Sequence, residues 1–136
     1  MKEKKGFEMV VRYPDLDKVP ASVTDDAEIE VIPLGRTYHG KEELREYAEW
    51  FFGSLSDIEI EVIDTTVSKD TIVSEIVVRA THTGPFLGYA PTGKRIEIRA
   101  CRVFTLRDGL VHHGRIYYDL ATVLRQIGAM EELKAA

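Results

Sequence analysis

The acidic, basic and thiol side chains of this sequence stand singly rather than in recognisable catalytic pairs. Asp119 follows the apolar segment 116–118 and precedes a helix-forming run, so its carboxylate has two interpretations. Held against aromatic walls, a carboxylate loses hydration, and its pKa rises into the range of a general acid or base. Placed before Leu120, it is also a good helix cap, and amide hydrogen bonds then lower its pKa. The motif alone favours the cap.

His82 stands at the end of an apolar segment, directly before a long loop. An imidazole at the rim of a pocket can carry a proton near neutral pH. The alternative, slightly favoured, is a hydrogen-bonded residue that orders the loop. The adjacent His112 and His113 point to opposite faces of a regular strand, so they cannot serve one site. No histidine pair has the i, i+4 spacing of a helical metal site, and we predict no metal centre.

Arg102 alternates with Ile98 and Phe104, which predicts a guanidinium on an apolar strand face. Because burying that charge is costly without an anion, Arg102 either orients a carbonyl, enolate or carboxylate group of a ligand or pairs with an internal acid. The internal pair is slightly favoured. The single cysteine, Cys101, is interpreted as a small buried side chain, since no histidine is paired with it locally. Aromatic side chains supply wall material for a pocket: Tyr38, Trp50, Phe86, Phe104 and Tyr117.

Hydrophobic periodicity predicts the elements that position these residues. Residues 2–13 predict a short helix or ordered arm that ends at Pro14. A second short helical turn, capped by Asp15, is predicted to extend to Val23, although Pro20 limits its length. The later predicted elements are a strand over 27–33, a helix over 41–52, a strand from 57 to a turn at 68–70, strands over 71–81, 95–106 and 110–118, and a helix over 120–127.

This order of elements predicts an α+β fold with the helices packed on one face of a meandering sheet. A curved, mainly antiparallel sheet wrapped around helices forms a cone and leaves a pocket on its concave face. The length of 136 residues suits one domain over 1–136, in which residues 1–14 form an N-terminal helix or arm.

Charge and composition exclude several function classes. With 18 Lys and Arg residues against 23 Asp and Glu residues, the net charge of −5 argues against a nucleic-acid-binding module. No apolar run is long enough to cross a membrane, and no signal peptide is recognisable. One cysteine cannot form an internal disulfide, which favours a cytoplasmic location. Phosphate-binding loops, dinucleotide fingerprints and nucleophile elbows are missing, so we expect no cofactor.

Four ordered motifs carry a family resemblance: Thr81-His82-Thr83-Gly84-Pro85-Phe86-Leu87-Gly88, Pro91-Thr92-Gly93-Lys94-Arg95, Arg107-Asp108-Gly109, and the run from Asp119 to Gly128. Together they resemble the SnoaL-like polyketide cyclase or ester cyclase family. That family belongs to the nuclear-transport-factor-2-like, or cystatin-like, superfamily of cone-shaped α+β domains. The resemblance covers roughly residues 27–128.

The resemblance implies a homodimer and a cofactor-free acid-base mechanism. In such cyclases an aspartate near the start of the last helix removes a proton for an intramolecular aldol closure. Asp119 occupies that position, and the resemblance makes it the leading catalytic candidate. His82 matches the histidine of the family's Thr-His-Thr-Gly segment. Many relatives carry a His-Trp pair ahead of the aspartate, where this sequence has Gly114 and Arg115.

The expected function is therefore a cofactor-independent enzyme that acts on an apolar, carbonyl-bearing small molecule, with Asp119 as base and with His82 and Arg102 in support. One alternative is a non-catalytic small-molecule-binding or dimerisation module of the same fold. A second alternative is an isomerase or dehydratase of the ketosteroid isomerase type. It needs a further acid beside the substrate oxygen, either Tyr38 or Tyr117.

Overall fold

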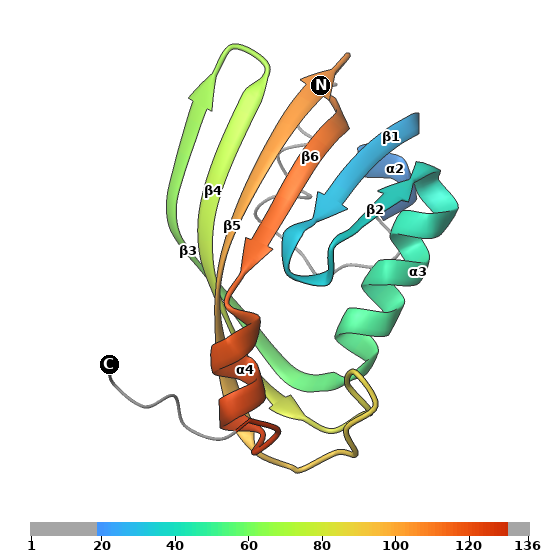
Figure 1. Ribbon diagram of the computed structural model, residues 1–136. Helices are drawn as coiled ribbons and strands as arrows, with labels where there is room; N and C mark the ends of the chain where they lie inside the picture. The colour runs from blue at the N-terminus through green and yellow to red at the C-terminus, as the bar shows by residue number, and fades with distance from the viewer. Residues whose placement is uncertain (1–18, 131–136) are drawn as a thin grey trace.

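The computed structural model describes residues 19–130 as one six-stranded sheet with helices (Figure 1). The elements are α2 (Val19–Ser22), β1 (Val23–Val31), the 3-10 turn η2 (Ile32–Leu34), β2 (Arg36–His39), α3 (Gly40–Gly53), β3 (Leu55–Ser68), β4 (Thr71–His82), β5 (Arg95–Arg107), β6 (Leu110–Tyr118) and α4 (Leu120–Gln126). The strand order is β2-β1-β6-β5-β4-β3. The predicted α+β class is confirmed, and the helix or arm predicted over 1–14 lies outside the described residues.

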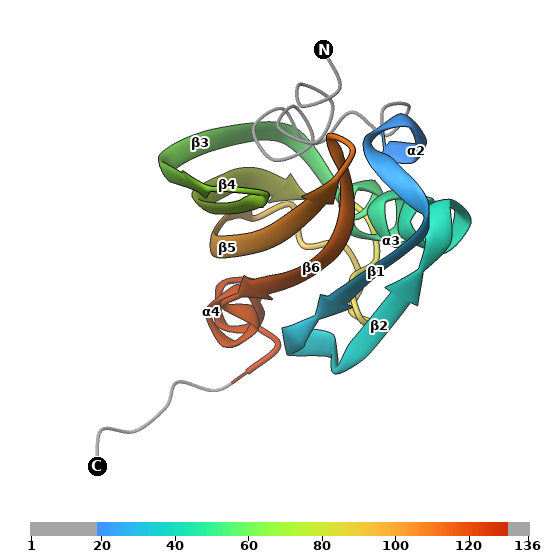
Figure 2. The same ribbon diagram turned by 90° about the horizontal axis from the view of Figure 1, so that it is seen from above.

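The sheet is curved, and α3 lies across its concave side (Figures 1 and 2). We call the side that faces α3 the inner face and the opposite side the outer face. Most inward-facing residues of β4 and β5 are buried, as a strand with one covered side requires. These residues form one apolar core with the buried face of α3: Ile76, Val78, Ala80, Ile96, Ile98, Phe104, Leu44, Tyr47, Ala48 and Phe51.

The loop after β4 is fastened to the end of α3. The backbone amides of Thr83 and Gly84 donate to the Ser54 carbonyl oxygen, at 3.1 and 3.0 Å. A Cβ atom at Gly84 would lie only 2.5 Å from the Gly53 carbonyl oxygen, so only glycine allows this approach. The Thr-His-Thr-Gly motif therefore has a structural role in joining β4 to α3.

Two predictions at the start of the described chain are wrong. Val23 begins β1 rather than ending a helical turn, because it pairs with Val111 of β6. The strand also ends at Val31, since Pro33 and the left-handed Gly35 form the turn η2. β1 lies parallel to β6, whereas all other neighbouring strands are antiparallel.

The two adjacent histidines do not lie on opposite faces as strict alternation predicts. The register between β5 and β6 shifts after Thr105, which marks a β-bulge. At this bulge the rings of His112 and His113 meet edge to face, with their centroids 4.4 Å apart. His112 Nδ1 lies 3.1 Å from Thr24 Oγ1, so the bulge joins β6 to β1.

Candidate functional site

Asp119 is the N-cap of α4 (Leu120–Gln126), as one of its two interpretations predicts. The hydroxyl of Thr122 donates to Asp119 Oδ2 at 2.6 Å, and the backbone amide of Thr122 donates to Oδ1 at 3.0 Å. These two hydrogen bonds hold the pKa of the Asp119 carboxyl below its usual value, and the charge of Arg125 lowers the pKa further. A carboxylate stabilised in this way is a weak base.

The cap makes a testable contribution to stability. We expect Asp119→Ala to lower the free energy of unfolding by about 0.5–2 kcal/mol at neutral pH, whereas Asp119→Asn keeps a comparable cap. Because the pKa is lower in the folded chain, the ionic part of this contribution is complete above the unfolded value near 3.8 and disappears as the pH falls through the folded value. Urea denaturation over this pH range should show the alanine variant and the wild type converging in acid. A difference in the free energy of unfolding that stays constant over this pH range would contradict an ionic contribution to the cap.

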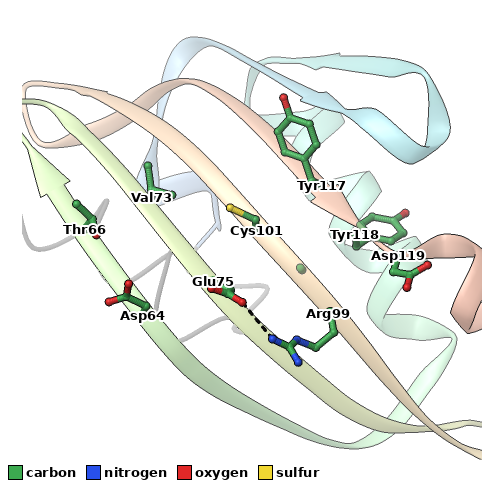
Figure 3. A pocket seen from close by; sticks show the side chains of 10 residues that line it. Asp64, Thr66, Val73, Glu75, Arg99, Cys101, Tyr117, Tyr118 and Asp119 are labelled. Carbon is green, nitrogen blue, oxygen red and sulfur yellow. Dashed lines mark hydrogen bonds and ion pairs between the residues drawn. The ribbon is translucent and has the colours of Figure 1, made fainter.

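Asp119 also borders an open hollow of about 590 Å³ on the outer face (Figure 3). The hollow crosses four strands and is lined by Asp64, Thr66, Val73, Glu75, Arg99, Ala100, Cys101, Tyr117, Tyr118 and Asp119. Its one guanidinium, Arg99 Nη2, lies 3.1 Å from Glu75 Oε1. Tyr117 is 40% exposed, so the aromatic wall expected beside Asp119 faces solvent. This open hollow gives Asp119 little of the desolvation that raises a carboxyl pKa.

His82 is almost completely enclosed, with 1% of its surface exposed. The backbone amide of Thr92 donates to His82 Nδ1 at 3.3 Å, and Thr92 Oγ1 lies 3.0 Å from the same nitrogen. Because a backbone N–H can only donate, Nδ1 is the acceptor, and the proton of the neutral ring is on Nε2. His82 borders a small, otherwise apolar pocket with Phe51 and Phe86. These contacts correspond to the loop-ordering alternative.

Arg102 is buried on the inner face, 4% exposed, directly opposite Ser74 of β4. Ser74 and His82 are eight residues apart on the same strand, which corresponds to roughly 26 Å at about 3.3 Å per residue. Asp119 lies beyond the end of β6, beside the outer hollow. The structure therefore does not bring Asp119, His82 and Arg102 together in one centre.

The inner face instead carries three tyrosines where β6 ends: Tyr38, Tyr47 and Tyr118. We call them the tyrosine cluster. The rings of Tyr38 and Tyr47 have centroids 4.8 Å apart, and the ring of Tyr118 lies 5.6 Å from that of Phe51. Burial raises the pKa of Tyr118 to about 12, although a side-chain hydrogen bond with Tyr47 opposes part of this rise. Tyr118 Oη has no hydrogen-bond partner of good geometry within residues 19–130.

The other predicted wall residues serve different purposes. Trp50 and Phe86 stack with their centroids 5.4 Å apart, and this stack ties the loop after β4 to α3. Phe104 is part of the sealed core, where a ligand would have no access. Tyr117 faces the outer hollow, whereas Tyr118 points in a different direction (Figure 3).

A family model described as SnoaL-like polyketide cyclase matches residues 6–127. The chain belongs to this family. The match spans nearly the whole chain, beyond the C-terminal motifs that carry the resemblance in the sequence. A search of curated protein sequences finds no significant match.

Solved structures extend the comparison to the fold. A proposed SnoaL-like polyketide cyclase from Jannaschia sp. CCS1 superimposes with a TM-score of 0.82 at 25% identity, covering 95% of both chains. A protein with a ketosteroid isomerase-like fold from Catenulispora acidiphila has a TM-score of 0.73 at 16% identity, with 92% and 91% covered. An LEH-like epoxide hydrolase from M. tuberculosis has a TM-score of 0.67 at 16% identity, with 93% of this chain and 88% of that chain covered. The predicted cone-shaped α+β fold, with a curved sheet wrapped around helices, is confirmed.

Sequence analysis of this SnoaL-like protein missed Tyr118 and Ser74. The alternation of inward-facing and outward-facing residues along β6 and β4 could have indicated both. Tyr118 is in phase with Ile116 and lies opposite Ala100 on the inner face, and Ser74 falls between the buried Ile72 and Ile76. A pocket was expected beside Asp119, and Tyr117, which shares the outer face with Asp119, was therefore predicted as a wall residue.

Within residues 19–130, His, Cys, Asp and Glu side chains do not form a group of three or more that is placed to hold a metal ion. The same part of the chain has no helix that is long and apolar enough to cross a membrane.

Proposed function

We propose that this protein takes an apolar, carbonyl-bearing small molecule on the inner face of its sheet and activates the carbonyl group for cyclase-type chemistry. One observation carries the proposal. Tyr118 presents a buried hydroxyl that makes no hydrogen bond of good geometry within the described residues, and it does so beside the aromatic rings of the tyrosine cluster and Phe51. Buried polar groups are normally satisfied, so a hydroxyl whose hydrogen bond with Tyr47 is poorly aligned has donor capacity left for a ligand.

The chemistry of a buried phenol suits this role. With a pKa raised to about 12, Tyr118 stays protonated at physiological pH and offers its O–H to an acceptor. A carbonyl oxygen that gains negative charge as an enolate forms is a stronger acceptor than the ground-state carbonyl. A fixed donor in an apolar setting therefore stabilises the enolate-like transition state more than the ground state. Carbonyl activation of this kind serves an aldol closure and an isomerisation alike.

The proton that leaves carbon needs an acceptor, and the family resemblance names Asp119. Its carboxylate must release at least one of its two hydrogen bonds from Thr122 before it can accept that proton. Because Asp119 borders the outer hollow and the tyrosine cluster lies on the inner face, Asp119 can act as the base only for a ligand that reaches past the end of β6 and displaces Thr122. The function of Asp119 is therefore tested separately from the binding of the ketone.

A hydrogen-exchange experiment tests the proposal without knowledge of the natural substrate. A neutral probe, para-methylacetophenone, is incubated with the protein in D2O, and NMR follows deuterium entry into its acetyl methyl group. We expect binding by calorimetry and exchange faster than in buffer, with exchange falling to the background rate in Asp119→Asn while binding persists. A protein that does not bind the ketone would overturn the proposal, and undiminished exchange in Asp119→Asn would exclude Asp119 as the base.

The variant Tyr118→Phe separates ligand binding from folding. Because the hydrogen bond between Tyr47 and Tyr118 Oη is poorly aligned, removing the hydroxyl should change the melting temperature little. The affinity for para-methylacetophenone should fall roughly tenfold, the size of one lost hydrogen bond. The matched control is Tyr117→Phe, the same change on the outer face, which should bind normally. Equal affinities in all three proteins would contradict the assignment of Tyr118.

A second candidate is a binding module of the same fold that performs no chemistry. The geometry of Asp119 favours this candidate, because an exposed N-cap carboxylate with a lowered pKa is typical of an aspartate with a structural role. This candidate predicts that the wild type binds para-methylacetophenone without accelerating exchange. It also predicts that Asp119→Asn changes neither binding nor stability to a measurable extent.

A further inference from the structure

Two cross-strand rows of side chains cross the outer face from β3 to β6. Residues that pair directly across antiparallel strands point to the same face, with Cβ atoms about 4.5–5.5 Å apart. The first row, which we call the valine row, consists of Thr66, Val73, Val103 and Arg115. The second row lies one step along the strands and consists of Asp64, Glu75, Cys101 and Tyr117. We call it the hollow row, because all its members line the outer hollow.

The two rows together carry an exposed apolar patch. Val73 is 37% exposed and Tyr117 is 40% exposed, and the half-buried Val103 and Cys101 lie between them. α3 packs on the opposite side of the sheet, so it leaves this patch open (Figure 2). A contiguous patch of exposed apolar side chains with polar groups at its rim is typical of a protein interaction surface.

The ends of the hollow row carry complementary polar groups. The other acids along this part of the outer face are paired with arginines: Glu59 with Arg95, Glu61 with Arg79, and Glu75 with Arg99. The Asp64 carboxylate forms no ion pair within residues 19–130. Tyr117 carries a phenol at the opposite end of the row (Figure 3). A row with an acceptor at one end and a donor at the other complements its own reversed copy.

A two-fold axis that runs along the strands, between β4 and β5, produces this reversal. It places β3 of one copy over β6 of a second copy, and β4 over β5. Asp64 of each copy then faces Tyr117 of the other copy, and Val73 faces Val103. Homodimers commonly use one self-complementary patch in this way, and sheets packed face to face keep their strands within about 30° of each other.

We propose that a second copy of this chain packs its outer face on this outer face, with Tyr117 of each copy seated in the hollow of the other beside Asp64. The ring of Tyr117 supplies apolar contact area, and its O–H donates to the Asp64 carboxylate. The inference concerns the outer face only and is independent of the proposed ketone site on the inner face.

The size of the outer face suits such an interface. β6 is the shortest of the four strands, with nine residues. Four strands about 4.8 Å apart and roughly 30 Å long give a flat area of roughly 600 Å². Because side chains make the accessible surface larger than the flat area, this face approaches the roughly 800 Å² per partner that stable interfaces bury.

Analytical ultracentrifugation of the full chain tests the surface. We expect the wild type to sediment as a dimer at micromolar concentrations. Tyr117→Glu places a second carboxylate beside Asp64 and should raise the dissociation constant at least about thirtyfold, the effect of losing a main contact residue. The matched control is Tyr89→Glu, which changes a tyrosine of similar exposure, 44%, in the loop after β4 and should leave the dissociation constant unchanged. A monomeric wild type, or a dimer that Tyr117→Glu does not weaken, would overturn the inference.

A charge exchange tests the pairing of Asp64 with Tyr117. In the double variant Asp64→Lys with Tyr117→Glu, each lysine faces a glutamate of the other copy, so the dissociation constant should return to within about tenfold of the wild-type value. The melting temperatures of the dilute, monomeric variants should agree closely, because both positions are exposed. A double variant that dimerises no better than Tyr117→Glu alone would contradict the proposed pairing and overturn this arrangement of the two copies.

Discussion

Replacing Phe104 with alanine is expected to lower the free energy of unfolding by about 3–5 kcal/mol. Phe104 is 1% exposed and is the largest fully buried side chain among residues 19–130. Its removal eliminates the transfer free energy of a whole ring and leaves a cavity in the core on the inner face of β5. Because the flanking strands are hydrogen-bonded on both sides, the backbone cannot collapse to fill that space.

Urea denaturation measures this loss through the shift of the midpoint at constant slope. Thr105→Ala is the control, since it changes the next residue of β5 on the exposed face and should cost far less. A loss below about 1 kcal/mol for Phe104→Ala would mean that the ring is not part of a close-packed core.

The second large effect is expected at Gly114, which lies directly opposite Phe104 in the sheet. A Cβ atom at this position would lie 2.8 Å from Cε1 of the Phe104 ring and closer still to Cδ1. Gly114→Ala should therefore destabilise the protein by about 1–3 kcal/mol through overpacking. A methyl group elsewhere on an exposed strand position has no such cost.

A double-mutant cycle identifies the cause. If the ring is the obstacle, Gly114→Ala should cost much less in the Phe104→Ala background than in the wild type, and the two changes should be strongly non-additive. The same cost in both backgrounds would place the obstacle in the backbone, at the Val103 carbonyl oxygen. The Phe104 ring thus occupies the space that a side chain at position 114 would need.

Local patterns in the sequence predicted most of the sheet. Alternation in β5 placed Arg102 on an apolar face with Ile98 and Phe104, and the structure confirms that arrangement. The helix predicted over 41–52 is α3, because its apolar residues recur at helical spacing and its first turn carries acids. The cap at Asp119 was also predicted, since capping depends on neighbouring residues only.

The relative positions of distant residues were not predictable in the same way. Whether the side chain of Asp119 faces the interior depends on the direction in which α4 leaves β6, and alternation along one strand contains no such information. The bulge at Thr105 likewise depends on how β5 and β6 pair. The candidate site therefore lies at Tyr118 on the inner face rather than at Tyr117 and Asp119 on the outer face, although Tyr117 and Tyr118 belong to the same strand pattern.

The parallel pairing of β1 with β6 has a consequence for how the chain is made. Val31 pairs with Ile116, so the second edge of β1 finds its neighbour only after most of the chain has left the ribosome. Until then the nascent polypeptide exposes an incomplete sheet with open backbone amides and carbonyls, the surface on which chains aggregate. We expect the expression yield to fall more when the chain is truncated within β6 than when substitutions disrupt the edge strand β3.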